Sequence, residues 1–150
     1  DGMGQHFFFD IGNGDCLAFF WFPDAPSAAP GQSSPAHLPG HGSIATAHGS
    51  MNHVAFDVAP EKFDAYCERL KVRGIKLSPV LNHDDSRYQV SQEVTDRVFV
   101  RSVYFFDPDG VCLEFAAWTK VFGPEDVAHD PMTATGERAV GVVTDLAPAG

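Results

Sequence analysis

The sequence of 150 residues predicts an α+β fold, and three observations point to that class. Hydrophobic periodicity over residues 51–119 gives the order β-α-β-β-β. This segment ends in a hairpin whose sequence is repeated in part near the N-terminus, in residues 5–22. A stretch rich in Pro, Ser, Ala and Gly, residues 23–50, separates the two parts. Together they predict a complete β-α-β-β-β module preceded by the last two strands of another.

A hairpin is predicted at the start of the chain. Residues 5–9 and 16–22 are rich in aromatic and other β-forming side chains. The residues between them include Gly12 and Gly14, which can adopt the positive φ angles of a tight turn. Residues 23–50 then lack both the strand and the helix period, and we interpret them as a linker.

The complete module begins with a strand over residues 51–58. Alternation places Val54 and Phe56 on one face of this strand, and His53 and Ala55 on the other. The apolar face is therefore expected to pack against the core, and His53 is expected to point away from it.

A helix is predicted over residues 60–73. Pro60 stands in the first turn, where proline is tolerated, and Gly74 follows the last turn as a C′ residue. Apolar side chains recur at i, i+4 and i+7 and give the helix one buried face: Phe63, Cys67 and Leu70.

Three more strands are predicted after the helix. A strand over residues 75–81 contains Pro79, which places it at a sheet edge or at a bulge. A polar loop then leads to a hairpin of residues 98–106 and 111–118, joined by an Asp-Pro-Asp-Gly turn. For the C-terminal stretch, a short strand at 140–143 and a mobile tail are both open alternatives.

The two predicted hairpins resemble each other. Aligning Gly14 with Gly110 pairs three further positions: Cys16 with Cys112, Leu17 with Leu113 and Phe19 with Phe115. We therefore expect the C-terminal hairpin of a first module at 1–22, a linker at 23–50, a second module at 51–119 and a tail at 120–150. The strand and helix that would open the first module are expected upstream of Asp1 or from a partner chain.

Composition excludes several classes of protein. The formal net charge of -10 disfavours nucleic acid and anionic membranes as partners, because phosphate binding needs a surplus of Lys and Arg. No apolar run reaches the ~18 residues of a membrane span, and the N-terminus lacks the pattern of a signal peptide. Three widely spaced cysteines form no CxxC pair, which favours a reducing compartment. A cytoplasmic location is expected.

Residues 51–119 resemble one module of the vicinal-oxygen-chelate superfamily, which includes glyoxalases, bleomycin-resistance proteins and extradiol dioxygenases. The resemblance rests on His53 in MNHVAFDV, on the helix end LKVRG and on YFFDPDGVCLE, which ends at Glu114. It covers the first hairpin only weakly. The resemblance implies paired βαβββ modules that form a half-open curved sheet around one divalent metal, with His53 and Glu114 as metal ligands.

The surroundings of the two candidate ligands agree with that implication. A carboxylate within VCLEFAAW is costly to bury unless it is paired or bound to a metal. Imidazole and carboxylate suit Fe(II), Mn, Ni or Zn. Two alternatives stay open: Glu114 paired with Arg101 of the adjacent strand, and His53 as a structural histidine.

The resemblance favours dioxygenase chemistry, with Fe(II) as the preferred metal. Ala18 occupies the position that matches Glu114, which counts against a glyoxalase site. A dioxygenase site would need a third ligand from the first module, expected upstream of Asp1. Tyr104 would hydrogen-bond a metal-bound substrate oxygen, although an ordinary aromatic strand residue is the alternative.

One departure from the dioxygenase pattern concerns a catalytic histidine. The positions where extradiol enzymes carry it hold Thr95, Asp96 and Arg97. His6 is a possible substitute in the substrate pocket, since the repeat alignment gives it the parity of Tyr104, and His83 is a candidate for a loop over the pocket.

The sequence therefore predicts a metal-dependent enzyme, extradiol-dioxygenase-like, that acts on a small apolar or aromatic substrate. A glyoxalase-like isomerase or lyase and a metal-free binding protein are the alternatives. A homodimer is expected, because pairing modules across chains would complete the sheet.

Overall fold

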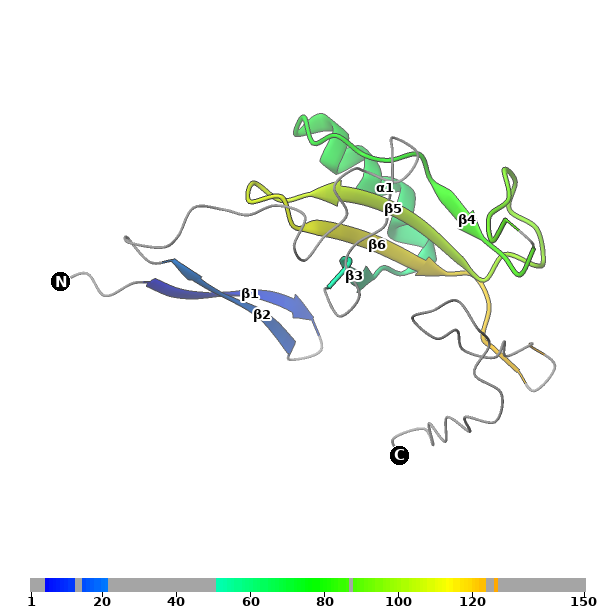
Figure 1. Ribbon diagram of the computed structural model, residues 1–150, viewed down its shortest axis with the longest axis horizontal. Coiled ribbons are helices and arrows are strands. Elements are labelled where there is room, and N and C mark those ends of the chain that lie inside the picture. Colours follow the sequence, from blue (N-terminus) through cyan, green and yellow to red (C-terminus); the bar gives the residue numbers. More distant parts are fainter. Residues whose placement is uncertain (1–4, 13–14, 22–50, 87, 124–125, 127–150) are drawn as a thin grey trace, which may run out of the picture.

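The computed structural model describes residues 5–12, 15–21, 51–86, 88–123 and 126. Figure 1 shows a four-stranded sheet with one helix, and a separate two-stranded hairpin. The elements are β1 (Gln5–Gly12), β2 (Asp15–Trp21), β3 (Val54–Asp57), α1 (Pro60–Val72), β4 (Leu81–His83), β5 (Val100–Phe106) and β6 (Cys112–Trp118). The order β3-α1-β4-β5-β6 confirms the predicted module and the α+β class.

The larger sheet has the strand order β3-β6-β5-β4. The first strand of the module, β3, runs parallel to the last, β6, while β4, β5 and β6 are antiparallel neighbours. Ala55 of β3 and Tyr104 of β5 both stand opposite Glu114 of β6. Glu114 therefore lies on an inner strand, with the first strand of the module on one side and the hairpin partner on the other.

Helix α1 begins and ends where the sequence predicts. Pro60 occupies the first turn, and Arg73 is the C-terminal cap residue. Gly74 follows with φ of 76°, a left-handed conformation that glycine adopts without steric cost. The amide of Ile75 donates to the carbonyl of Leu70, and this bond closes the helix with a Schellman motif.

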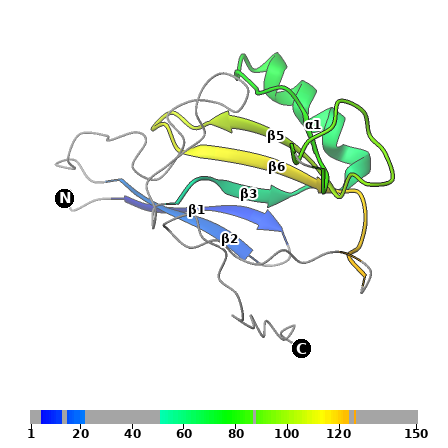
Figure 2. The ribbon, with the colours of Figure 1, turned by 45° about the vertical axis from the view of Figure 1, so that its right-hand side comes forward.

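One face of the sheet packs against the helix. Figure 2 shows α1 along this side of the sheet. Phe63 and Cys67 are buried against Val58, Val103 and Ala117. The predicted apolar face of the helix is confirmed for Phe63 and Cys67, and its third member is half-buried. These contacts form the main hydrophobic core, which lies between α1 and one face of the sheet.

The opposite face carries the candidate site. Because side chains alternate along a strand, Tyr104, Cys112 and Glu114 all point away from the helix. Tyr104 and Cys112 form a second buried cluster, against which Leu81 and Phe106 pack. The carboxylate of Glu114 is therefore held at the border of an apolar cluster.

The strand predicted over residues 75–81 is wrong, because β4 comprises only Leu81–His83. Ser78 still contacts β5: its amide donates to the carbonyl of Tyr104 (2.9 Å), and its hydroxyl accepts from the Tyr104 amide (2.9 Å). Pro79 follows directly and has no N–H for a ladder. The serine side chain thus replaces a backbone carbonyl, and regular pairing begins two residues after the proline.

The hairpin β1-β2 has a register that matches the predicted repeat. Phe8 pairs with Ala18, and Tyr104 pairs with Glu114, so each pair is ten residues apart along the chain. Ala18 therefore occupies the position that Glu114 has in the second hairpin. The segments 23–50 and 140–143 lie outside the described residues, as does most of the predicted tail.

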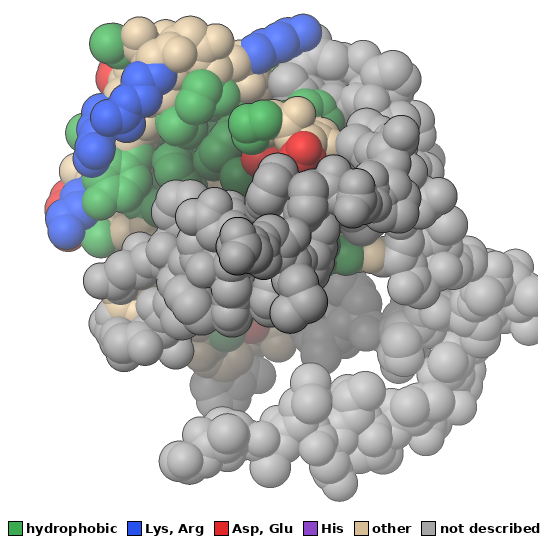
Figure 3. All heavy atoms as spheres, turned by 90° about the vertical axis from the view of Figure 1, so that its left-hand side faces the viewer, with side chains coloured by type: hydrophobic (Ala, Val, Ile, Leu, Met, Phe, Trp, Pro, Cys, Tyr) green, Lys and Arg blue, Asp and Glu red, His purple; other side chains and the backbone are tan. Residues whose placement is uncertain are grey.

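The described surface has polar and apolar parts. Figure 3 shows hydrophobic side chains beside Lys and Arg side chains on the face seen from the left of Figure 1. Val72, at the end of α1, is 85% exposed.

In the described part of the chain, no helix has the length and apolar character needed to cross a membrane.

Candidate metal centre

His53 and Glu114 meet on the face of the sheet that points away from the helix. His53 Nε2 lies 2.8 Å from Glu114 Oε2. The His53 side chain is 32% exposed and that of Glu114 only 7% exposed. His53 stands one residue before β3, and Glu114 is in the middle of β6. The parallel pairing of β3 with β6 brings these two side chains together across 60 residues of sequence.

The His53 ring is held by two further neighbours. Its Nδ1 lies 2.8 Å from Asn52 Oδ1. On its other side, the Tyr104 ring packs edge-to-face, with centroids 5.4 Å apart and an interplanar angle of 89°. Contacts to Asn52, Tyr104 and Glu114 therefore fix both the position and the rotation of the imidazole.

Both ring nitrogens of His53 face an oxygen that accepts hydrogen bonds. Asn52 Oδ1 accepts at Nδ1, and the Glu114 carboxylate faces Nε2. A neutral imidazole carries one N–H and can satisfy one of the two. The arrangement is complete when one further positive charge, a proton or a metal cation, lies between Nε2 and the carboxylate.

The electrostatics of Glu114 favour the ionised carboxylate. Burial alone raises the pKa of this carboxyl, but the hydrogen bond from His53 and the hydroxyls of Ser102 and Tyr104 outweigh it and lower the pKa below its usual range. A buried carboxylate that stays charged is the form that binds a divalent cation.

Ser102 is a buried polar residue beside this pair. It has no exposed surface, and its Oγ has no partner that meets hydrogen-bond geometry in the described part of the chain. It shares the face of Glu114, because Ser102 and Tyr104 are two residues apart on β5. Its hydroxyl lies near enough to Glu114 to help lower the pKa of that carboxyl. An orphaned buried hydroxyl beside a charged carboxylate fits a site that is completed by a bound ligand.

Two other ionisable groups at the site stay protonated. Burial, followed by the negative charge of Glu114, raises the pKa of the Tyr104 phenol far above its usual value. The same two causes raise the pKa of the Cys112 thiol to about 11. Tyr104 is therefore a hydrogen-bond donor at neutral pH, and Cys112 is a small apolar neighbour rather than a thiolate ligand.

The alternative pairing of Glu114 with Arg101 is wrong. Arg101 stands opposite Ala117 and therefore points to the helix side of the sheet. There its guanidinium reaches Asp64 Oδ1 at 3.3 Å and lies 4.8 Å above the Phe63 ring. The physical reason is strand parity, since Arg101 is an odd number of residues from Tyr104, the direct partner of Glu114.

The geometry of the pair fits a cation. Two ligands bound to one metal at about 2.1 Å and at about 90° lie about 3 Å apart. The 2.8 Å separation of His53 Nε2 and Glu114 Oε2 is close to that value. In the described residues, no group of three His, Cys, Asp or Glu side chains is placed to hold a metal. The described chain therefore offers two candidate ligands, the imidazole of His53 and the carboxylate of Glu114.

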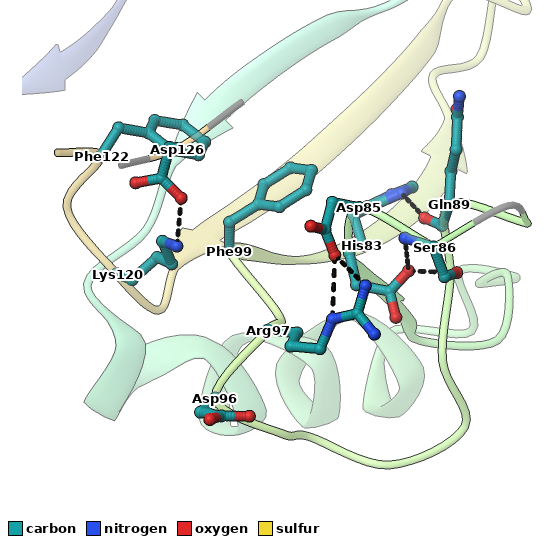
Figure 4. Close-up of a pocket in the computed structure, with 11 residues that line it drawn as sticks. His83, Asp85, Ser86, Gln89, Asp96, Arg97, Phe99, Lys120, Phe122 and Asp126 are labelled. Atoms are coloured by element: carbon teal, nitrogen blue, oxygen red, sulfur yellow. Dashed lines mark hydrogen bonds and ion pairs between the residues drawn. The ribbon is translucent and has the colours of Figure 1, made fainter. Parts of the chain in front are cut away.

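His83 lies apart from this pair. It is the last residue of β4 and lines a separate cavity of about 460 Å³. Figure 4 shows this cavity beside two ion pairs, Arg97 with Asp85 and Lys120 with Asp126. Neither His53 nor Glu114 lines it. Sequence reasoning missed this cavity, because most of its lining residues lie outside the strands and follow no periodic pattern.

His6 lies on β1 and pairs with Phe20, two positions along the ladder from the pair formed by Phe8 and Ala18. It therefore keeps the parity of Phe8, which is the counterpart of Tyr104 in the repeat. In the repeat, its own counterpart is Ser102. Its role in a pocket stays a prediction.

Comparison with known proteins gives three findings. Residues 1–115 match the family model of the Glyoxalase/Bleomycin resistance protein/Dioxygenase superfamily. The fosfomycin resistance protein FosX of Listeria innocua serovar 6a is 37% identical over 70 residues, which cover 47% of this chain and 44% of that protein. This chain therefore spans less than half the length of that relative. A crystal structure of the genomically encoded FosX of Listeria monocytogenes aligns with a TM-score of 0.46 and 21% identity, over 79% of this chain and 70% of that one.

Proposed function

The chain belongs to the glyoxalase/bleomycin resistance protein/dioxygenase superfamily, the vicinal-oxygen-chelate proteins, and we propose that it is a metal-dependent enzyme in which His53 and Glu114 bind one divalent cation. The carrying observation is the 2.8 Å contact between His53 Nε2 and the buried Glu114 carboxylate. Imidazole and carboxylate together suit Fe(II), Mn, Ni or Zn. A third ligand would have to come from outside the described residues.

The proposed substrate is small and binds through two neighbouring oxygens. A divalent cation at this position would act as a Lewis acid and lower the pKa of a bound substrate hydroxyl. Tyr104 stands directly opposite Glu114 and keeps its proton, so it would donate a hydrogen bond to one substrate oxygen. Leu81 and Phe106, which pack around Tyr104 and Cys112, would contribute an apolar wall.

Ring cleavage of an aromatic diol is the first candidate reaction, with Fe(II) as the favoured metal. It is supported by the conjunction of His53, Glu114 and Tyr104 on one face. It is also supported by the charge of that face: in β3 to β6, the positions that share the face of Glu114 hold no Lys or Arg. A neutral substrate fits such a face better than an anionic one does.

Modification of fosfomycin is the second candidate. The identity of 37% over 70 residues to a fosfomycin resistance protein supports it. Fosfomycin carries an anionic phosphonate, however, and would need Lys or Arg side chains from outside the described strands. A homodimer is proposed for either reaction, since it would bring two modules together.

One experiment separates these candidates. The chain is purified without metal, loaded anaerobically with Fe(II), Mn²⁺, Ni²⁺ or Zn²⁺, and given a panel of catechols in an oxygen electrode. A parallel sample receives fosfomycin and is followed by ³¹P NMR. Glu114→Ala should abolish any activity, and the matched Glu68→Ala should not, because Glu68 is exposed on α1, where it pairs with Lys71.

Oxygen uptake with a catechol supports the first candidate, and a shifted phosphorus resonance supports the second. A preparation that binds none of the four metals contradicts the proposal and leaves a metal-free binding protein.

A further inference from the structure

The cavity that His83 lines takes no part in the proposed reaction. Its volume of about 460 Å³ is in the range of small-molecule sites. Its lining comes from residues 83–99, at and after the end of β4, and from residues 120–126, after β6. Neither His53 nor Glu114 lines it, so a ligand in this cavity would occupy a separate site.

The described lining of the cavity has a surplus of negative charge. Four carboxylates and two basic side chains line it: Asp84, Asp85, Asp96, Asp126, Arg97 and Lys120. As Figure 4 shows, both basic side chains are already ion-paired with one of these carboxylates. Among the described residues, Asp84 and Asp96 form no ion pair with a Lys or Arg. The cavity therefore offers two carboxylates to a positively charged ligand.

The fold holds one of these carboxylates, that of Asp84, in a fixed position. Asp84 is only 7% exposed, and its Oδ1 accepts hydrogen bonds from the Ser86 amide (3.1 Å) and hydroxyl (2.6 Å). The hydroxyl bond lowers the pKa of Asp84, so the group is charged at neutral pH. Both bonds go to one oxygen, which leaves Oδ2 for water or a bound ligand.

The loop that carries Asp84 has an unusual backbone. Gln89 adopts a φ of 59°, a left-handed conformation that is uncommon for a residue other than glycine. Its carbonyl accepts from the Asp84 amide (3.3 Å) and lies 3.3 Å from His83 Nδ1. Residues 84–89 thus form a tight loop, which orients the carboxylate before any ligand binds.

Two phenylalanine rings give the cavity an apolar wall. Phe99 and Phe122 lie with their ring centroids 5.5 Å apart, and Phe122 is 53% exposed. The Lys120 ammonium is 5.9 Å from the centre of the Phe122 ring, a cation–π contact. Aromatic faces attract organic cations and also pack against their apolar parts.

We propose that this cavity is a second binding site, for a small organic cation with an apolar body, such as an arylalkylamine or a quaternary ammonium compound. The ammonium group would lie near Asp84, and the apolar body would lie against Phe99 and Phe122. This inference does not rest on the proposed function, because the cavity shares no residue with the pair of His53 and Glu114.

Two other kinds of ligand fit this cavity less well. An anion would have to displace a carboxylate from Arg97 or from Lys120 before it could pair with either. Asp126, the partner of Lys120, is also held by the Gly123 amide (2.8 Å). A metal ion would need several ligands in one place, and the described residues offer no group of three His, Cys, Asp or Glu side chains placed for one.

The test compares three probes of similar size and different charge: benzyltrimethylammonium, benzyl alcohol and phenylacetate. Each is titrated into the ¹⁵N-labelled, metal-free chain at constant ionic strength, and ¹H–¹⁵N correlation spectra locate and measure the binding. We expect the ammonium probe to shift the amides of Ser86, Gln89 and Phe99, with a dissociation constant of about 1 mM. The other two probes should bind about tenfold more weakly or less tightly still.

Two variants test the carboxylate and the aromatic wall separately. Asp84→Asn removes the charge and keeps an oxygen that can accept from Ser86. Phe122→Ala removes a half-exposed ring, so the fold should tolerate it. We expect either change to raise the dissociation constant of the ammonium probe about fivefold to tenfold. Asp64→Asn is the matched control and should bind as the wild type does, because Asp64 is exposed on α1 and pairs with Arg101.

Three results would overturn the proposal. Phenylacetate that binds as tightly as the ammonium probe would assign the cavity to anions, through Arg97 and Lys120. Shifts centred on Tyr104 and Glu114 would place the probe at the candidate metal centre instead. Unchanged affinity in Phe122→Ala, or no shift with the ammonium probe at about 10 mM, would show that the cavity does not bind organic cations.

Discussion

Tyr104 and Glu114 are direct cross-strand partners, and both point away from helix α1. The carboxylate raises the pKa of the phenol in addition to burial, so the hydroxyl stays protonated beside a charged neighbour. Tyr104 also packs its ring against His53. Tyr104 therefore has two roles: its ring packs against the imidazole of His53, and its hydroxyl is a hydrogen-bond donor at the candidate site.

Tyr104→Phe separates these purposes, because it keeps the ring and removes the hydroxyl. We expect metal affinity to be unchanged and kcat on the active substrate to fall about 100-fold, the typical effect of losing one donor to a reacting oxygen. Tyr66→Phe is the control, since Tyr66 lies on α1 against Phe115. Steady-state kinetics of the three proteins test this, and full activity of Tyr104→Phe contradicts the assigned role.

The two buried serines are expected to differ in their effect on stability. Ser78 Oγ accepts from the Tyr104 amide, so Ser78→Ala should lower the free energy of unfolding by about 1–3 kcal/mol. Ser102 Oγ has no partner that meets hydrogen-bond geometry in the described part of the chain, so Ser102→Ala should lower it by less. Urea denaturation of the metal-free variants measures both.

Ser102→Ala should also weaken metal binding, because the hydroxyl lies near Glu114 and helps to keep its carboxylate charged. Unchanged Zn²⁺ affinity in this variant would show that the orphaned hydroxyl has no part in the site.

The main core depends on Phe63, which is fully buried between the helix and the sheet. Phe63→Ala should cost about 3–5 kcal/mol of unfolding free energy through lost apolar contacts and a residual cavity. Val72→Ala, on the exposed end of the same helix, should change it by less than about 0.5 kcal/mol. Chemical denaturation of both variants provides the test, and equal losses would contradict the packing described.

Cys112 should be unreactive in the folded protein. Its pKa is raised to about 11, so only about one thiol in a thousand is a thiolate at pH 8. Alkylation with iodoacetamide, followed by peptide mass analysis, should label Cys112 quickly in urea and very slowly without it. Rapid labelling of the folded chain would mean that the cluster around Tyr104 opens readily.

Much of the second module follows from local sequence. Pro60 and Gly74 mark the ends of the helix because each has a backbone requirement that depends on its own position. The pairing of Tyr104 with Glu114 follows from the Asp-Pro-Asp-Gly turn, where Asp107 Oδ1 accepts from the amides of Asp109 and Val111 and sets the register.

The errors arise where tertiary contacts replace a local pattern. The strand expected over residues 75–81 is absent because the side chain of Ser78 takes over a backbone bond next to Pro79. Arg101 was a candidate partner of Glu114 by proximity along the hairpin, but strand parity directs it to Asp64. The contact between Asn52 Oδ1 and His53 Nδ1 lay beyond a sequence argument, since it depends on the rotation of the imidazole.

The most direct test of the metal centre is elemental analysis of the purified chain beside His53→Ala and Glu114→Ala. Arg101→Ala is the control, since its guanidinium lies on the helix side of the sheet. We predict about one equivalent of a divalent transition metal in the wild type and in Arg101→Ala, and loss of that metal in both ligand variants. No metal in the wild type after anaerobic reconstitution, or full retention in His53→Ala and Glu114→Ala, would contradict the account.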